Sequence, residues 1–81
     1  MTEQELQESL LELGFFVDEN LRYSRRNKNR ELNIDVQSLW VYIEILDYEK
    51  KDNLFFTAFL SLRGFSYDLI LINIKHFITI L

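Results

Sequence analysis

The first regular pattern along the chain is helical. Thr2 and Glu5 have the spacing of a capping box, in which a hydroxyl and a carboxylate satisfy free backbone amides at a helix start. Apolar side chains then recur at intervals of three and four residues, which places them on one helix face. They are Leu6, Leu10 and Leu13. Gly14 follows as a residue that can close a helix in the left-handed conformation, so the pattern predicts a helix over residues 3–13.

After Gly14 the apolar positions alternate with polar ones, which is the period of a strand. Residues 15–24 and 32–36 both follow this alternation. The stretch 27–29 between them favours a turn, because asparagine tolerates positive φ. These segments predict a β-hairpin.

A second hairpin is predicted further along the chain. Residues 39–48 and 54–63 each have the composition of a strand, and the polar stretch 49–53 joins them as a turn. The chain contains no proline, so each strand can donate backbone hydrogen bonds along its whole length.

The C-terminal segment, residues 66–81, carries isoleucine at alternate positions between Ile70 and Ile80. This spacing favours a further strand, because β-branched side chains suit a pleated surface. The alternative is a helix, which would give the order helix, four strands, helix and would add a second covering layer to the sheet. The predicted fold class is therefore α+β, with one N-terminal helix packed on an antiparallel sheet of four or five strands arranged as a meander of hairpins.

Composition limits what else the chain can be. Its 81 residues fit one small domain, residues 1–81, and a chain of this size has a small core. The absence of cysteine excludes a disulfide, and the single histidine leaves too few ligands for a cysteine or histidine zinc site, so we expect no metal and no cofactor. The acidic start MTEQELQE lacks the features of a secretory signal, which predicts a cytoplasmic protein. The most apolar stretch, 69–81, is shorter than the roughly 20 residues of a membrane helix, so we expect no membrane association.

The two strands of the second hairpin are apolar on both faces. Aliphatic side chains occupy alternate positions and point to one face of the sheet. The positions between them point to the other face and include four aromatic side chains, Trp40, Tyr42, Phe55 and Phe59. One helix of this length, roughly 16 Å, cannot cover both faces of a sheet. Four aromatic side chains could expose on the order of 600–1,000 Å², whereas the largest apolar patch on an ordinary monomer is about 300–600 Å². We therefore predict a protein interface at these residues, made with another protein or with a second copy, unless the C-terminal segment covers them within the chain.

A basic cluster lies around the first turn. Five cations fall within nine residues, with one tyrosine among them, and we take these as candidate docking residues for an anion or a partner: Arg22, Tyr23, Arg25, Arg26, Lys28 and Arg30. Three alternatives remain for what these basic side chains contact: the phosphates of a nucleic acid, an acidic patch on a protein, or solvent alone. The net charge of −4 and the pI near 4.8 count against nucleic acid, because the rest of the chain would repel a polyanion.

No catalytic motif is present, and two glycines cannot build a glycine-rich phosphate loop. We expect no enzyme. The sequence predicts a noncatalytic protein-binding domain. We interpret it as a small acidic inhibitor of the immunity or anti-defence type that occludes the surface of a target enzyme, acting singly or as a homodimer. The alternative function is nucleic-acid binding through the basic hairpin tip.

Overall fold

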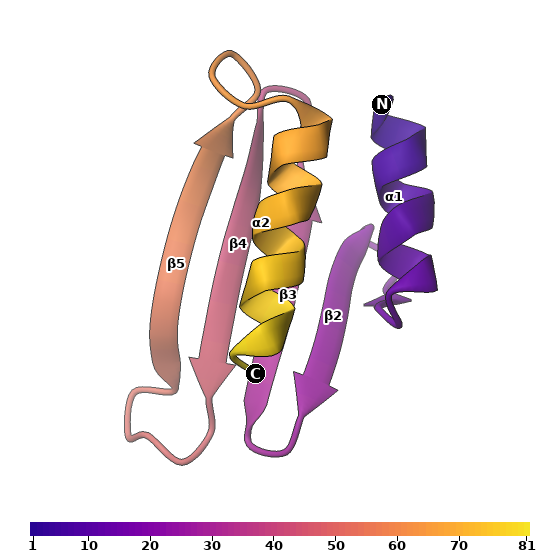
Figure 1. The fold of residues 1–81 in the computed structure, drawn as a ribbon. Coiled ribbons are helices and arrows are strands. Elements are labelled where there is room, and N and C mark those ends of the chain that lie inside the picture. Colours follow the sequence, from indigo (N-terminus) through magenta and orange to yellow (C-terminus); the bar gives the residue numbers. More distant parts are fainter.

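The elements follow one another along the chain as helix, five strands and helix. A computed structural model describes all 81 residues. The bounds are α1 (Glu3–Glu12), β1 (Phe16–Val17), β2 (Arg22–Asn27), β3 (Arg30–Val36), β4 (Trp40–Asp47), β5 (Leu54–Ser61) and α2 (Tyr67–Thr79). The strands lie side by side in chain order and every neighbouring pair is antiparallel, which gives a meander (Figure 1). The predicted α+β class with an antiparallel sheet is confirmed.

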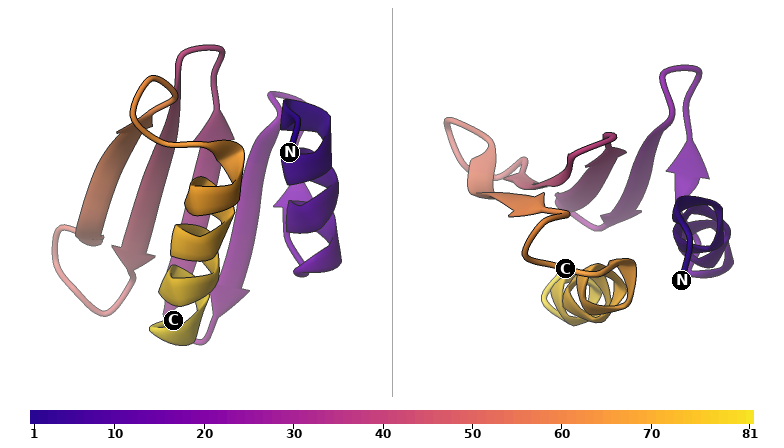
Figure 2. Two further views of the ribbon diagram at one scale, coloured as in Figure 1. Left: turned by 45° about the horizontal axis from the view of Figure 1, so that its top comes forward. Right: turned by 90° about the horizontal axis from the view of Figure 1, so that it is seen from above.

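Both helices pack on the same face of this sheet, as the view along the strands in Figure 2 shows. Between the helices and the sheet lies a single hydrophobic core of twelve buried residues. The helices contribute Leu6, Leu10, Ile70, Leu71 and Ile74, and the sheet with its entry segment contributes Phe15, Tyr23, Leu32, Ile34, Val41, Ile43 and Ile45. The fold therefore has two layers, and the opposite face of the sheet has no helix over it.

The predicted N-terminal helix is confirmed. Thr2 accepts a hydrogen bond from the Glu5 amide, and the Glu5 carboxylate accepts one from the Thr2 amide, which completes the capping box. At the other end Gly14 adopts a φ of 89°, and the Phe15 amide donates to the Leu10 carbonyl, as in a Schellman cap. The cap brings Phe15 back against Leu10 in the core.

The prediction of a strand over residues 66–81 is wrong, because most of this segment forms α2. Ser66 caps its first turn by accepting from the Leu69 amide. The isoleucine spacing fits either structure, since positions four apart share a helix face while the position between them points away. Accordingly Ile70 and Ile74 are fully buried, whereas Ile72 is 61% exposed.

The first predicted strand is also divided. Residues 15–24 do not run straight, because a turn at Asp18–Leu21 separates β1 from β2. The Asp18 carboxylate accepts from the backbone amides of Asn20 and Arg22, and Leu21 takes a positive φ of 60°. The two predicted hairpins are confirmed as β2–β3 and β4–β5, although the positive φ of the first turn falls on Lys28 and not on either asparagine.

Candidate protein-binding face

The uncovered face of the sheet, called here the open face, carries every second side chain of β2 to β5. Cross-strand partners in the β4–β5 ladder show which side chains share it, because directly opposed residues point to the same side. Trp40 lies opposite Ser61, and Tyr42 lies opposite Phe59. The alternate positions Val41 and Ile43 point the other way, into the core.

Three rings on the open face form an aromatic cluster, made of Trp40, Tyr42 and Phe59. The ring centroids of Trp40 and Phe59 are 5.2 Å apart in an edge-to-face arrangement, and those of Tyr42 and Phe59 are 4.7 Å apart. These contacts fix the rings against one another. Phe59 nevertheless remains 65% exposed and Trp40 37% exposed. The alternative in which the C-terminal segment covers these side chains is wrong, because α2 packs on the opposite face.

Phe55 does not join this cluster. The register between β4 and β5 shifts at Ile45 and Leu46, so that Leu46 pairs with Leu54 and Phe55 has no directly opposed partner. The Phe55 ring instead lies 4.5 Å from the guanidinium carbon of Arg30 and 4.6 Å from the ammonium of Lys50. Cation–π contacts of this kind hold the ring at the end of the sheet, away from the aromatic cluster.

A polar network borders the aromatic cluster on β2 to β4. Its centre is Asn33, which is 4% exposed and donates to the carboxylates of Glu31 and Glu44 while accepting from the Ser24 hydroxyl. The Glu44 carboxylate also accepts from Arg22 at 2.7 Å and from the Tyr42 hydroxyl at 2.9 Å. The network therefore holds the open face in one arrangement and connects to the aromatic cluster through Tyr42.

Two phenols of this face are held in the protonated form. Burial, with a hydrogen bond to Glu44, raises the pKa of the Tyr42 hydroxyl above its ordinary value. A hydrogen bond to Glu31, with burial, raises the pKa of the Tyr48 hydroxyl in the same direction. Both hydroxyls donate in these hydrogen bonds.

The basic residues of the first hairpin are divided between the two faces. Arg25 donates to the Leu13 carbonyl at 2.8 Å, at the end of α1. Arg26 lies over the Tyr48 ring at 4.5 Å on the open face. Arg22 pairs with Glu44 in the polar network, and Tyr23 is buried in the core. The structure therefore does not bring these residues together as one cationic surface.

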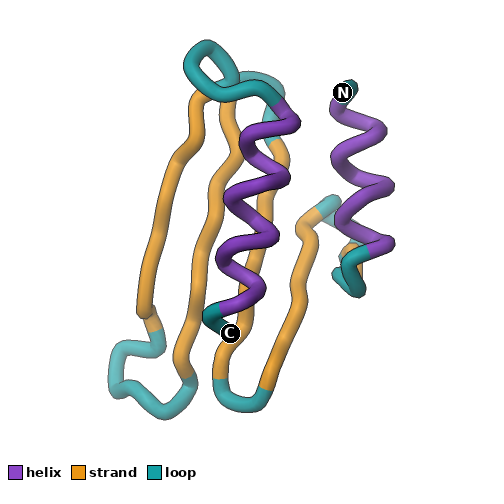
Figure 3. Tube along the Cα trace, in the orientation of Figure 1, coloured by secondary structure: helices purple, strands orange, loops and turns teal.

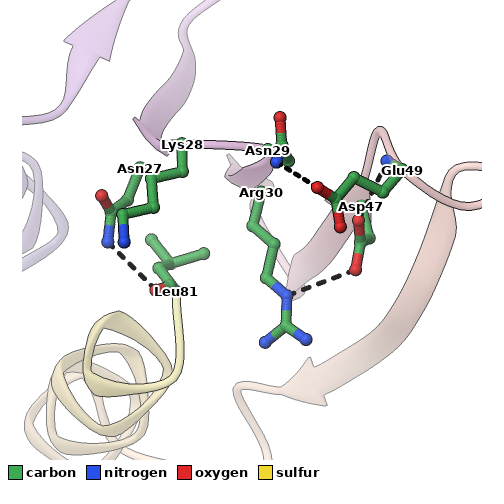
Figure 4. A pocket seen from close by; sticks show the side chains of 7 residues that line it. All are labelled: Asn27, Lys28, Asn29, Arg30, Asp47, Glu49 and Leu81. Carbon is green, nitrogen blue, oxygen red and sulfur yellow. Dashed lines mark hydrogen bonds and ion pairs between the residues drawn. The ribbon is translucent and has the colours of Figure 1, made fainter.

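The remaining two residues of the basic cluster, Lys28 and Arg30, border a hollow of about 190 Å³ beside the first turn (Figure 4). Arg30 is 3.4 Å from the Asp47 carboxylate and donates to the Ile80 carbonyl at 2.8 Å. Arg30 therefore ties the end of α2 to the sheet, where the negative end of the helix dipole favours a cation. The other lining residues are Asn27, Asn29, Asp47, Glu49 and Leu81.

The side chains of this hollow are largely paired with one another. Asn27 donates to the Leu81 carbonyl, and Asn29 donates to the Glu49 carboxylate. No group of three or more histidine, cysteine or acidic side chains in the protein is arranged to hold a metal ion. Neither of the two helices has the length and apolar character needed to cross a membrane.

The sequence interpretation missed the polar network of the open face. A signal for it was present, because β3 carries Glu31, Asn33 and Asp35 at alternate positions on one face, and Leu32, Ile34 and Val36 on the other. That alternation separates a polar face from a buried face in β3, whereas β4 and β5 lack it.

Comparison with known proteins gives no match at the level of a family model, a curated protein or a solved structure.

Proposed function

We propose that this protein is a noncatalytic protein-binding domain that uses its open face to cover a surface of another protein, in the manner of a small inhibitor. One observation carries the proposal: the aromatic cluster of Trp40, Tyr42 and Phe59 lies on the face opposite both helices, with Trp40 and Phe59 exposed. Aromatic side chains dominate the energetics of protein interfaces. Rings that are already packed together lose little further freedom when a partner covers them.

The chemistry of the face indicates what kind of surface it binds. Asp35 lies opposite Tyr42 in the β3–β4 ladder and takes part in no salt bridge. The protein as a whole carries a net charge of −4. The expected partner surface is therefore an apolar patch bordered by lysine or arginine, since complementary charge speeds encounter and rejects acidic proteins.

The test begins with capture of the partner from the source cells. Wild-type protein is the bait, beside the double variant Trp40→Ser, Phe59→Ser and the control variant Ile72→Ser, which removes an exposed apolar side chain from the helical face. The retained protein is then purified and binding is measured by calorimetry in the presence of nuclease. Two interface hot spots of about 2 kcal/mol each correspond to a loss of roughly 1,000-fold in affinity for the double variant.

The control separates a specific interface from general stickiness. The Ile72→Ser variant is expected to bind as the wild type does, because Ile72 lies on α2. Equal affinity of the double variant and the wild type would contradict the proposal. Loss of binding on addition of nuclease would favour the nucleic-acid alternative.

A further inference from the structure

The two edges of the sheet differ in length and charge. The edge at β1 has only two residues, is followed by Asp18 and Glu19, and adjoins α1. The edge at β5 has eight residues, Leu54–Ser61, with no helix beside its outer side (Figure 1). Turns leave β5 at its two opposite ends, so they do not run along this side (Figure 3).

The backbone groups that point outward from β5 follow from two hydrogen bonds. The Leu62 amide donates to the Leu39 carbonyl, and the Gln37 amide donates to the Trp40 carbonyl. Since amides and carbonyls of a strand alternate in direction, Leu60 and Ala58 bond to β4. The Ser61 carbonyl already accepts from the Gly64 and Phe65 amides. By the same alternation, the amides and carbonyls of Thr57 and Phe59, together with the Ser61 amide, point away from the sheet. These groups are the free donors and acceptors of the edge.

The bulge at Phe55 interrupts β5 near its start, but nothing protects the edge between Phe56 and Ser61 from pairing. The segment LFFTAFLS contains no charged residue and no proline, which are the usual means by which proteins block an edge strand. All its residues are exposed or half-exposed, on both faces of the sheet, because α2 lies over β3 and β4. The strand thus offers apolar side chains above and below a row of unpaired backbone groups.

We propose that β5 pairs antiparallel with β5 of a second copy of this chain. A two-fold axis normal to the sheet and midway between the two β5 strands keeps corresponding faces on the same side. Open-face side chains of one copy then lie beside open-face side chains of the other, and helical-face side chains lie beside helical-face side chains. Pairing brings no like charges opposite each other within Leu54–Ser61. Beyond the strand, Arg63 of one copy approaches the turn 49–53 of the other, whose two acidic and two basic residues cancel. The side chains and charges of β5 therefore allow it to pair with the β5 of a second copy.

The exposed area indicates how tight the pairing is. Phe55, Phe56 and Phe59 of β5 and the adjacent Trp40 are 39%, 37%, 65% and 37% exposed. At about 150–250 Å² for a whole aromatic side chain, they offer at most roughly 270–450 Å² per copy. This is below the about 800 Å² per partner of a standard interface, so we expect a weak dimer that forms only as the protein concentration rises.

The dimer goes beyond the proposed function and does not depend on it. Edge pairing joins two sheets into one of ten strands and places two aromatic clusters on one continuous open face. Edge pairing depends on the outward backbone groups of β5, whereas partner binding depends on the rings of the open face, so the two can fail separately. Face variants test the first, and variants of the outward backbone test the second.

The experiment measures mass and amide protection over a range of concentrations. Sedimentation velocity from about 1 μM to about 1 mM is expected to follow a change from 9.8 kDa to twice that mass. Hydrogen exchange, read by NMR, is expected to show that the Thr57 and Phe59 amides gain protection as the dimer forms. Amides that already bond within the sheet, such as Ala58, are expected to change little.

The variant Thr57→Pro removes an outward amide without removing a bond to β4, and it is expected to weaken dimerisation at least tenfold. The control Thr57→Val keeps the amide and the size of the side chain and is expected to leave the dimer intact. If the proline variant does not fold, Thr57→Lys places a charge in the pairing and serves the same purpose. A monomer throughout the concentration range would overturn the proposal, as would a dimer in which these amides stay unprotected. A dimer lost in Trp40→Ser but kept in Thr57→Pro would likewise overturn it.

Discussion

The two faces of the sheet are formed by the same strands, but one face is buried under the helices and the other is exposed. In β4, Val41, Ile43 and Ile45 are fully buried beneath the helices, while the neighbouring Trp40 and Tyr42 project to the open face. Both sets are strongly apolar, so hydrophobicity does not distinguish the core from the binding surface. The helices make the distinction, since both pack on one side. We expect the buried set to determine stability and the exposed set to determine association.

The largest expected difference between the two faces is the loss of unfolding free energy when a side chain is truncated to alanine. Ile43→Ala on the helical face should lower the free energy of unfolding by about 2–5 kcal/mol, because it leaves a cavity in a closed core. That is a large part of the roughly 4–12 kcal/mol expected for a domain of this size. Phe59→Ala on the open face should cost less than about 1 kcal/mol, since most of that ring is already in water. Denaturant unfolding of both variants measures the difference, and equal losses would contradict this division of the sheet.

The arginines of the first hairpin should show the same division at a smaller scale. Arg25→Ala removes a charged hydrogen bond to Leu13 at the end of α1 and should cost about 1 kcal/mol. Arg26→Ala, on the open face, should cost less than about 0.5 kcal/mol, because that guanidinium is exposed. Thermal unfolding at matched ionic strength distinguishes the two. A greater loss for Arg26 than for Arg25 would contradict the structural role given to Arg25.

The phenols of the open face predict a dependence of stability on alkaline pH. The pKa values of Tyr42 and Tyr48 are raised above the value of about 10 that applies in the unfolded chain. Their contribution is therefore fully present below pH 10 and is lost as the pH rises through the higher folded values. Unfolding measured between about pH 9 and pH 12 should show this loss, and Tyr42→Phe should reduce it. Stability that stays level over this window would show that the two hydroxyls do not hold the face together.

The smallest effect is expected at the turn, which belongs to neither face. Lys28 adopts a φ of 57°, which costs a residue with a side chain of order 1 kcal/mol. Lys28→Gly should relieve that strain. Glycine also makes the unfolded chain more flexible, which offsets part of the gain, so we expect the free energy of unfolding to rise by about 0.5 kcal/mol. Calorimetric Tm values of the variant and the wild type measure it. A lower Tm in the variant would mean that the lysine side chain stabilises the turn.

Local signals in the sequence predicted the parts of the fold that depend on local chemistry. The capping box and Gly14 located α1 to within a residue, and the polar turns located both hairpins. The C-terminal helix was missed because its isoleucines satisfy a strand period and a helix period equally, and only the packing of Ile70 and Ile74 decides between them.

The candidate site could be predicted only in part, for the same reason. Alternation placed Trp40, Tyr42 and Phe59 on one face, but the single-residue register shift that displaces Phe55 leaves no mark in the sequence. The basic cluster was predicted as one surface, because a sequence shows which residues are charged but not which groups they contact in the fold. Arg25 and Arg30 contact carbonyls at the ends of helices that are distant along the chain, so their use became visible only in the folded protein.

The central claim, that the open face binds another protein, is tested most directly by photo-crosslinking in the source cells. Benzoylphenylalanine replaces Phe59 on the open face in one variant and Ile72 on α2 in the other, two positions that are 65% and 61% exposed. The account predicts that the variant at Phe59 forms a defined adduct with a different protein, and that the variant at Ile72 does not. An adduct from Ile72 without one from Phe59, or only an adduct of the chain with itself, would contradict it.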